Sequence, residues 1–370
     1  MTPRNEGELA GILKDAAAQG TRLRIKGGGT RTGLGNQVTS NTVVEASALE
    51  GISLYEPGAL TIVAKAGTPL SEIENTLSEA GQMLPFEPTD HSGLFGHTDG
   101  VPTIGGVVAV NASGPRRLQA GACRDALIGV RFVDGTGEII KNGGRVMKNV
   151  TGYDLVKLMA GSYGTLGVLT EVSFKVLPKP ETAVTLQIEG LDSKKAQSAM
   201  SAAMKTPFDV TGAAHVQSNG NSTTSVRLEG FHASVTYRAR ELKSVMDRFG
   251  RTEVTDQADI WQRLRRFSYM PDSGEIWQIS AKPTDSPTIL DRVSAYVADY
   301  TMDWSGGLLT FSVPQGRDVR ADIGGYPAQV VCLRGNARAF HEQPLPLAQI
   351  EAGLRGKFDP SNILNPGIMG

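Results

Sequence analysis

The sequence predicts an α+β protein with two domains. Its 370 residues, 40% of them hydrophobic, exceed what one compact core usually holds. Short segments that alternate polar and apolar residues are interspersed with segments whose apolar residues recur at helical spacing. Glycine clusters are frequent before about residue 180 and thin out after it. We therefore expect a first domain over residues 1–180 and a second domain beyond it.

Helices and short strands are mixed in the first domain. The spacing of apolar residues predicts a helix over 6–19, closed by Gly20 as a C-terminal cap. Asp134-Gly135 predicts a hairpin across 127–141, because this pair supplies the positive backbone angles of a tight turn. The other elements that we expect are strands at 21–26, 41–46, 60–67 and 82–86, a helix over 70–80, and a β-rich run over 164–180.

The second domain, expected over 181–352, contains the same order of elements twice. In the first round a strand at 183–190 precedes a helix at 194–204, a strand at 225–231 and a helix at 236–249. The second round has a strand at 275–283, a helix at 287–300 and a strand at 306–314. This order favours a ferredoxin-like α+β domain, an antiparallel sheet covered by helices. The tail, 353–370, returns to the Asn/Pro/Gly-rich style of the first domain, so we expect it to rejoin that domain.

Charge and cysteine content exclude several classes of function. Lys plus Arg number 37 against 38 for Asp plus Glu, so no net field attracts nucleic acid or an anionic membrane surface. The chain's two cysteines, Cys123 and Cys332, cannot build a disulfide framework or a four-cysteine zinc or iron–sulfur site. We find no secretory signal and no run of about 18 apolar residues, and we expect a cytoplasmic protein.

The segment from Lys26 to Arg31, KGGGTR, directly follows a predicted strand. Three glycines allow several main-chain N–H groups to approach one phosphate, and the flanking cations and Thr30 would add charge and a hydroxyl. A flexible surface loop is the alternative. The segment is not a P-loop, because no glycine–lysine–hydroxyl run occurs in the chain. It does not fit the dinucleotide fingerprint either, because Thr32 stands at the third glycine position and a poor helix sequence follows.

Two further clusters of small residues lie in the first domain. Residues 102–125 carry a glycine pair and three arginines, and residues 143–172 alternate glycines with polar side chains. Close packing between loops explains either cluster alone. Together with the first glycine loop, they favour an elongated ligand with a diphosphate at its centre.

Four segments resemble, in order, the vanillyl-alcohol-oxidase-type (PCMH-type) FAD-binding family. They are IKGGGTRTGLG, PTIGGVVAVNASG, KNVTGYDLVKLMAGSYGTLGVLTEVSFKVLPKP and FDPSNILNPG. Overall length, the GYDL phrase and the short second domain are most similar to the branch of FAD-binding subunits of bacterial glycolate oxidase (glycolate dehydrogenase). The resemblance implies a PCMH-type domain followed by a smaller cap domain, and an FAD-dependent oxidoreductase.

The resemblance also implies cofactor-binding residues. They are Lys26, Gly27, Gly28, Gly29, Thr30, Arg31, Thr103, Gly105, Gly106, Asn111, Gly114, Gly152, Tyr153, Gly167, Val168 and Asn365. Residues 26–31 would cradle the pyrophosphate, Gly167 and Val168 would flank the adenine or ribose, and Asn365 would reach back toward the flavin. Because residues 27–31 contain no histidine for a covalent link, we expect non-covalent FAD. We expect His91 and His97 at the surface rather than against the isoalloxazine.

No residue is assigned to catalysis or to a metal. The larger hydroxy-acid-oxidising relatives carry a paired-histidine motif, H-x-x-G-[DE]-G-N-x-H, that this sequence lacks. His215, His232 and His341 stand far apart, and no carboxylate cluster replaces them. A flavin can still pass electrons without a protein base, since the cofactor carries the redox chemistry.

Three functions remain open at this point. The first is an FAD-holding subunit of a glycolate-oxidising complex, which relays electrons between a catalytic flavoprotein subunit and an iron–sulfur subunit and meets the membrane only through its partners. The second is a self-sufficient FAD-dependent 2-hydroxy acid dehydrogenase, in which Arg263, Arg265 and Arg266 grasp the substrate carboxylate. That basic run is otherwise a solvated helix face. The third is a scaffold without flavin.

Overall fold

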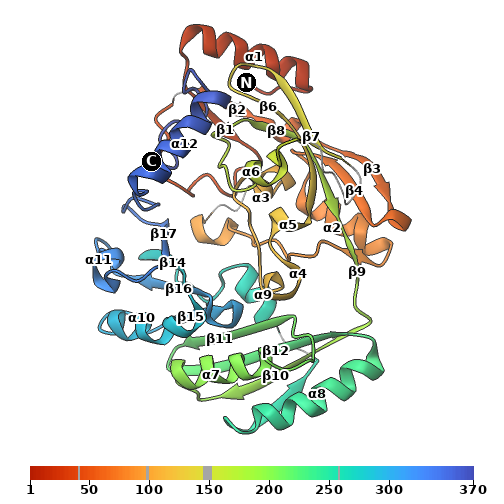
Figure 1. Ribbon diagram of the computed structural model, residues 1–370, viewed down its shortest axis with the longest axis vertical. Coiled ribbons are helices and arrows are strands. Elements are labelled where there is room, and N and C mark those ends of the chain that lie inside the picture. Colours follow the sequence, from red (N-terminus) through yellow and green to blue (C-terminus); the bar gives the residue numbers. More distant parts are fainter. Residues whose placement is uncertain (41, 97–99, 145–151, 257–258) are drawn as a thin grey trace. The chain divides into compact units, whose positions relative to one another are not determined.

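The computed structural model describes residues 1–40, 42–96, 100–144, 152–256 and 259–370 (Figure 1). The chain divides into two compact units. The first comprises residues 1–113, 122–179 and 342–370, and the second comprises residues 114–121 and 180–341. The expected domains differ from these units in two places: residues 114–121 belong to the second unit, and the chain re-enters the first unit at Glu342 rather than at 353.

Short helices and three small sheets build the first unit. Its elements are α1 (Glu6–Gln19), β1 (Leu23–Lys26), β2 (Thr42–Glu45), β3 (Ile52–Glu56), β4 (Thr61–Lys65), α2 (Leu70–Glu79), β5 (Gln82–Met83), α3 (Ile104–Ala109), α5 (Cys123–Ala126), β6 (Leu127–Val133), β7 (Ile139–Gly143), α6 (Leu155–Met159), β8 (Val168–Lys175), β9 (Leu177–Pro178) and α12 (Leu345–Phe358). A five-stranded antiparallel sheet has the order β3-β4-β8-β6-β7. β1 pairs in parallel with β2, and β5 pairs with β9.

Local sequence explains where α1 begins and ends. Asn5 Oδ1 accepts a hydrogen bond from the main-chain N–H of Glu8 at 2.9 Å and caps the amino end. Gly20, at φ 64°, closes the carboxyl end in the left-handed conformation. Leu9 and Leu13 are fully buried in a core that also contains β1 and the tail. The helix predicted over 6–19 is therefore confirmed.

The hairpin predicted at 127–141 is present as β6 and β7, but its turn is wider than expected. The main-chain N–H of Asp134 donates to Glu138 O at 3.1 Å, and Asp134 Oδ1 accepts from the N–H of Thr136 and Glu138. The positive φ, 82°, belongs to Gly137 rather than to Asp134 or Gly135. The carboxylate of Asp134 thus organises a longer connection, and the predicted two-residue turn is wrong.

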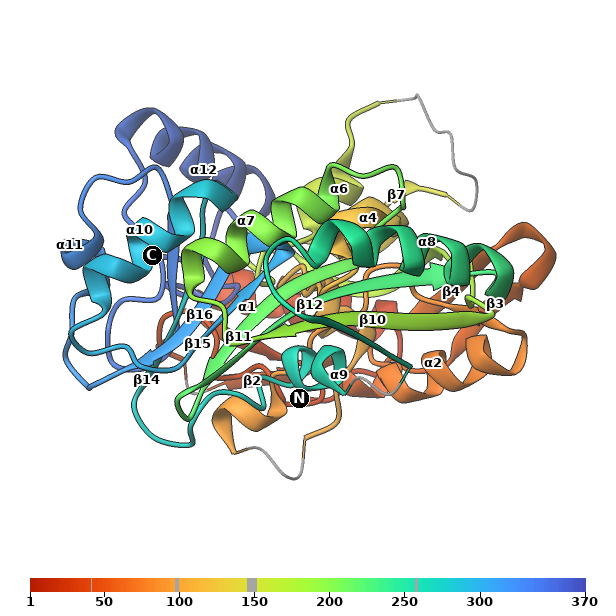
Figure 2. The same ribbon diagram turned by 90° about the horizontal axis from the view of Figure 1, so that it is seen from below.

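The second unit is built around one eight-stranded antiparallel sheet. Its elements are α4 (Arg117–Ala120), β10 (Thr182–Glu189), α7 (Ser193–Met204), β11 (Gly212–Ser218), β12 (Asn221–Gly230), α8 (His232–Met246), β13 (Thr252–Thr255), α9 (Ile260–Arg265), β14 (Glu275–Ser280), α10 (Ser286–Val293), β15 (Tyr300–Asp303), β16 (Leu308–Val313), α11 (Val319–Ile323) and β17 (Gln329–Arg334). Figure 2 shows α7 and α8 lying along one side of this sheet and α9 on the other.

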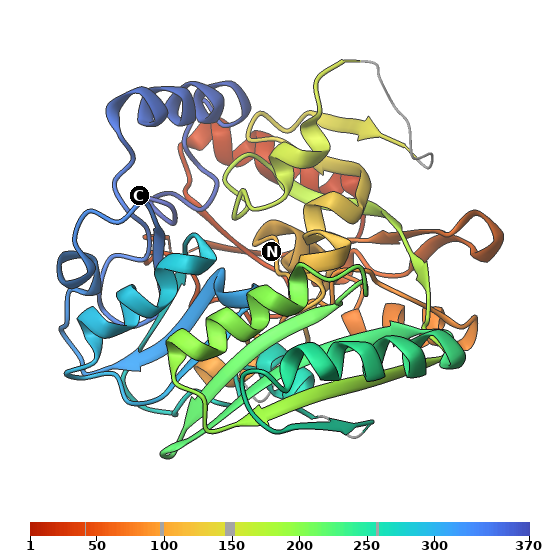
Figure 3. The ribbon, with the colours of Figure 1, turned by 60° about the horizontal axis from the view of Figure 1, so that its bottom comes forward.

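The sheet consists of two halves with the same β-α-β-β-α-β order. β10 to β13 form one half and β14 to β17 the other, in the spatial order β13-β10-β12-β11-β15-β16-β14-β17. The halves meet where β11 pairs antiparallel with β15, with His215 opposite Met302. Side chains from the strands and from α7, α8 and α10 form one hydrophobic core. Figure 3 shows the long helices of this unit lying along the sheet. The α+β class predicted from the sequence is confirmed.

Candidate functional site

The glycine loop, residues 27–31, follows β1 and packs so closely at Gly28 that a side chain would not fit there. A Cβ atom on Gly28 would lie 1.6 Å from the carbonyl oxygen of Val101. The main-chain N–H of Val101 donates to Gly28 O at 2.9 Å, which holds the two segments together. Gly29 has φ 88°, a conformation that favours glycine. Sequence and geometry therefore agree that this loop presents bare backbone.

Several main-chain N–H groups of the glycine loop have no acceptor among the described residues. Among the hydrogen bonds between residues that the structure describes, none is donated by the main-chain N–H of residues 28–31. Thr30 is only 2% exposed. Because a buried N–H without an acceptor costs free energy, this arrangement suits an anionic ligand that accepts from several of these groups.

Arg31 brings positive charge to the same loop. Its Nη2 donates to Thr89 O at 2.8 Å and its Nη1 to Thr30 Oγ1 at 3.3 Å, while its buried Nε has no partner among the described residues. Burial lowers the pKa of the guanidinium to about 10, against the opposing effect of the Asp90 carboxylate. Arg31 is therefore still charged at neutral pH and fits a phosphate acceptor.

Thr103, the N-cap of α3, lies against the glycine loop. Its Oγ1 accepts from the main-chain N–H of Gly106 at 3.4 Å, and a Cβ atom on Gly27 would lie 2.6 Å from that oxygen. A Cβ atom on Gly106 would lie 3.6 Å from Arg31 Nη1. The structure thus brings together the predicted residues of the glycine loop, Thr103 and Gly106.

Three other predicted residues have packing roles. The main-chain N–H of Gly105 donates to Ala66 O at 2.7 Å, and a Cβ atom there would lie 2.7 Å from the Ala66 side chain. A Cβ atom on Gly167 would lie 2.6 Å from the ring of Phe132. Val168 is 1% exposed and belongs to the core beneath α1. These residues shape the unit around the loop.

Two asparagines bind main-chain N–H groups of the first unit, and Lys26 makes a side-chain ion pair. Asn365 Oδ1 accepts from the N–H of Ile25 at 2.8 Å, at the strand that leads into the glycine loop. Asn111, at φ 52°, accepts from the N–H of Arg124 at 3.0 Å. Lys26 Nζ lies 3.4 Å from the carboxylate of Glu45 on the neighbouring strand.

Two predicted residues lie away from the glycine loop, and a third belongs to the second unit. A Cβ atom on Gly152 would meet no described atom within 4 Å, and Tyr153 is 89% exposed. Gly114 belongs to the second unit, where its carbonyl accepts from Trp304 Nε1 at 3.1 Å. The structure does not bring Gly152 or Tyr153 to the glycine loop.

His91 corrects the expectation of a surface histidine. Its side chain is buried, and the pKa of the imidazole lies well below its ordinary value because of burial and the nearby charge of Arg31. A single histidine in a polar loop gives no sequence signal for this position. His97 lies outside the described residues.

The described residues offer no metal site. No group of three or more His, Cys, Asp or Glu side chains in this part of the chain is placed to hold a metal ion.

The basic run at α9 is the candidate carboxylate-binding group of the sequence. Its Arg263 and Arg266 are exposed, and the Arg263 guanidinium lies 4.0 Å from the centroid of the Tyr269 ring. Within the described ranges no helix is long and apolar enough to cross a membrane.

Known proteins resemble this chain over part or nearly all of its length. The FAD binding domain family matches residues 1–143. Glycolate oxidase subunit GlcE of Escherichia coli is 36% identical over 363 residues, which cover 96% of this chain and 95% of that subunit. Glycolate oxidase subunit GlcD of Bacillus subtilis is 33% identical over 187 residues, half of this chain but only 38% of the relative.

A solved structure shares the fold at low identity. Alkyldihydroxyacetonephosphate synthase superposes with a TM-score of 0.72 over 99% of this chain and 75% of its own, at 16% identity. The family and the FAD cofactor expected from the sequence are confirmed by these comparisons. The chain belongs to the FAD-linked oxidoreductases, in the family of the glycolate oxidase subunit GlcE.

Proposed function

We propose that this chain is the FAD-holding subunit of a glycolate-oxidising dehydrogenase complex. One observation carries the proposal: the chain is 36% identical to GlcE over 96% of its length. The main-chain N–H groups of residues 28–31, which have no acceptor among the described residues, support the same proposal. In the complex, the bound flavin would relay electrons between a catalytic flavoprotein subunit and an iron–sulfur subunit. The half-length similarity to GlcD supports a flavoprotein partner with a related cofactor domain.

We infer that FAD binds non-covalently through the first unit. The N–H groups of residues 28–31 would donate to the pyrophosphate oxygens, and the Arg31 guanidinium would balance their charge. Thr103 and Gly106 would close the same site from α3. The flavin supplies two-electron redox chemistry when bound, and the chain supplies its position and electrostatics.

Partner subunits follow from what this chain does not contain. Its two cysteines cannot hold an iron–sulfur cluster, so a cluster would belong to another subunit. No described group of side chains offers the metal-assisted chemistry of larger hydroxy acid dehydrogenases. We propose a cytoplasmic location, with any membrane contact made through the partners.

The test is to purify the chain alone and together with its co-purifying partners. The chain alone should be yellow and release FAD on heat or acid treatment. Glycolate should reduce a dye acceptor only when the partners are present. Turnover of glycolate by the isolated chain would establish the self-sufficient dehydrogenase instead. A colourless chain that takes up no added FAD would support the third function, a scaffold without flavin.

A further inference from the structure

Residues 114–121, here called the strap, leave the first unit after Ser113 and return to it at Ala122. The first unit holds the two ends of the strap close together. Ser113 Oγ accepts from the main-chain N–H of Cys123 at 2.9 Å, and Asn111 Oδ1 accepts from that of Arg124 at 3.0 Å. The strap is therefore an Ω-loop whose base is fixed by the cofactor unit.

The second unit holds the middle of the strap. Trp304 Nε1 donates to Gly114 O at 3.1 Å, and the Arg117 guanidinium lies 4.3 Å from the Trp304 ring centroid. Leu118 packs against the hydrophobic core of the second unit. Arg116 adds an ion pair, with its Nη1 2.5 Å from Glu229 Oε2 on β12.

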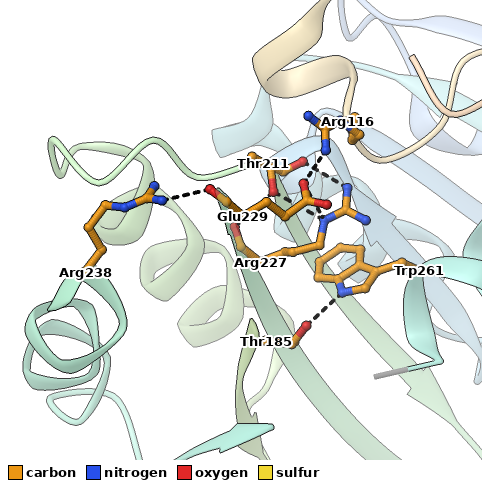
Figure 4. Close-up of polar contacts among 7 residues, drawn as sticks. All are labelled: Arg116, Thr185, Thr211, Arg227, Glu229, Arg238 and Trp261. Carbon is orange, nitrogen blue, oxygen red and sulfur yellow. Dashed lines mark hydrogen bonds and ion pairs between the residues drawn. The ribbon is translucent and has the colours of Figure 1, made fainter. Parts of the chain in front are cut away.

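The pair of Arg116 and Glu229 is buried, with side chains 6% and 10% exposed. Figure 4 shows Arg116 and Arg227 converging on the one carboxylate of Glu229 from different segments. Arg227 lies 3.4 Å from Glu229 and 4.7 Å from the Trp261 ring centroid. Buried pairs of this kind are costly to break because the remaining charge loses its partner.

The strap is also continuous with the proposed FAD site. Thr103, which lies against Gly27 and Gly28, caps α3, and α3 ends at Ala109, shortly before the strap begins. The short helix α3 and the Asn111 hydrogen bond thus connect the glycine loop with the base of the strap. Thr103 contacts the glycine loop at one end of this connection, and Asn111 holds the base of the strap at the other.

We propose that the strap couples FAD binding in the first unit to the second unit, and that Arg116 is its positioning residue. The proposal rests on the proposed FAD site. Coupled sites typically alter each other's affinity five- to 150-fold, and the effect is reciprocal. Bound FAD should thus slow hydrogen exchange in the strap and in β12. Loss of the contacts between the strap and the second unit should in turn lower the affinity for FAD.

The experiment compares two variants that remove one guanidinium each from the same carboxylate. Arg116→Met removes the buried ion pair of the strap and leaves Glu229 paired with Arg227. Arg227→Met leaves the strap paired and removes an equally buried arginine from the second unit. FAD affinity is measured by titration of flavin fluorescence with the full chain, and hydrogen exchange of β12 is followed with and without FAD.

We expect Arg116→Met to weaken FAD binding about tenfold and to abolish the FAD-dependent protection of β12, while Arg227→Met leaves FAD affinity within twofold. Should Arg116→Met fail to fold, Trp304→Phe, which removes the hydrogen bond to Gly114, must weaken FAD binding in the same direction. Unchanged affinity in the strap variant, or equal loss in both arginine variants, overturns the coupling. A wild-type chain that binds no FAD overturns the proposed function itself.

Discussion

The side-chain oxygen of Asn365 accepts a hydrogen bond from the main-chain N–H of Ile25, 340 positions earlier in the chain, at 2.8 Å. The same side chain donates through Nδ2 to Tyr163 O, also at 2.8 Å. Asn365 is 4% exposed, so both contacts are shielded from water. The tail thereby fixes the strand that leads into the glycine loop.

Replacing Asn365 with alanine should destabilise the first unit and weaken FAD binding. The change removes the part-buried hydrogen bonds to the N–H of Ile25 and to the carbonyl of Tyr163, at a cost of about 0.5–1.5 kcal/mol for each. Urea unfolding and FAD titration measure the two effects. Asn219→Ala, at an exposed asparagine that also has positive φ, is the control. Equal behaviour of the two variants would contradict the role given to Asn365.

Gly28→Ala should abolish FAD binding while the second unit stays folded. The added methyl group would lie 1.6 Å from Val101 O, so the loop must move away from the geometry in which its donors converge. FAD titration and hydrogen exchange of β11 and β12 measure both parts of the prediction. Gly58→Ala, where a Cβ meets no atom within 4 Å, should behave as wild type. Normal FAD stoichiometry in Gly28→Ala would show that the loop is misassigned.

Arg31→Met should weaken FAD binding about 10- to 100-fold, the range for losing a charged hydrogen-bond donor. Arg31→Lys should recover only part of this affinity, because one ammonium cannot reproduce the guanidinium contacts to both Thr30 and Thr89. Arg22→Met, at an exposed arginine, is the matched control in isothermal titration. If Arg31→Met bound FAD with wild-type affinity, the Arg31 guanidinium would not be part of the FAD site.

His215 should make the second unit less stable in mild acid. The imidazole is fully buried, with Nδ1 2.9 Å from Thr224 Oγ1, and burial lowers its pKa to about 4 against a weak opposing effect of Asp192. The unfolded chain has a pKa near 6.5, so the fold favours the neutral form. Stability is then complete above about pH 6.5 and falls by roughly 3 kcal/mol as the pH drops to about 4.

The measurement is the free energy of unfolding as a function of pH for wild type and for His215→Gln. The difference between the two should shrink steadily below pH 6.5, whereas His232→Gln, at an exposed histidine, should track wild type. Parallel curves for His215→Gln and wild type would mean that the buried imidazole does not titrate in this window.

Elements with strong local signals could be predicted from the sequence. The apolar spacing and the caps of α1 depend on neighbouring residues, and the glycines of residues 27–29 lie within one short segment. The hairpin at β6 and β7 was predictable in position but not in turn type, because the Asp134 carboxylate accepts from two N–H groups further along the chain. Strands such as β11 and β15 lack a sustained alternation that marks them as strands.

The parts that sequence could not provide depend on contacts between distant segments. Gly167 serves packing against Phe132, and Tyr153 is exposed, although both lie in the same glycine-rich stretch. His91 is buried beside Arg31, 60 positions earlier. The strap joins the second unit through Glu229, which no local pattern links to Arg116. Which glycine meets a ligand and which meets a neighbouring side chain is decided by tertiary packing.

Hydrogen exchange of the purified chain with and without FAD tests the central claim most directly. We predict one FAD bound per chain, with main-chain protection gained at residues 28–31, whose N–H groups have no acceptor among the described residues. Stoichiometric binding with protection confined to other segments, or no binding at saturating FAD, would contradict the account.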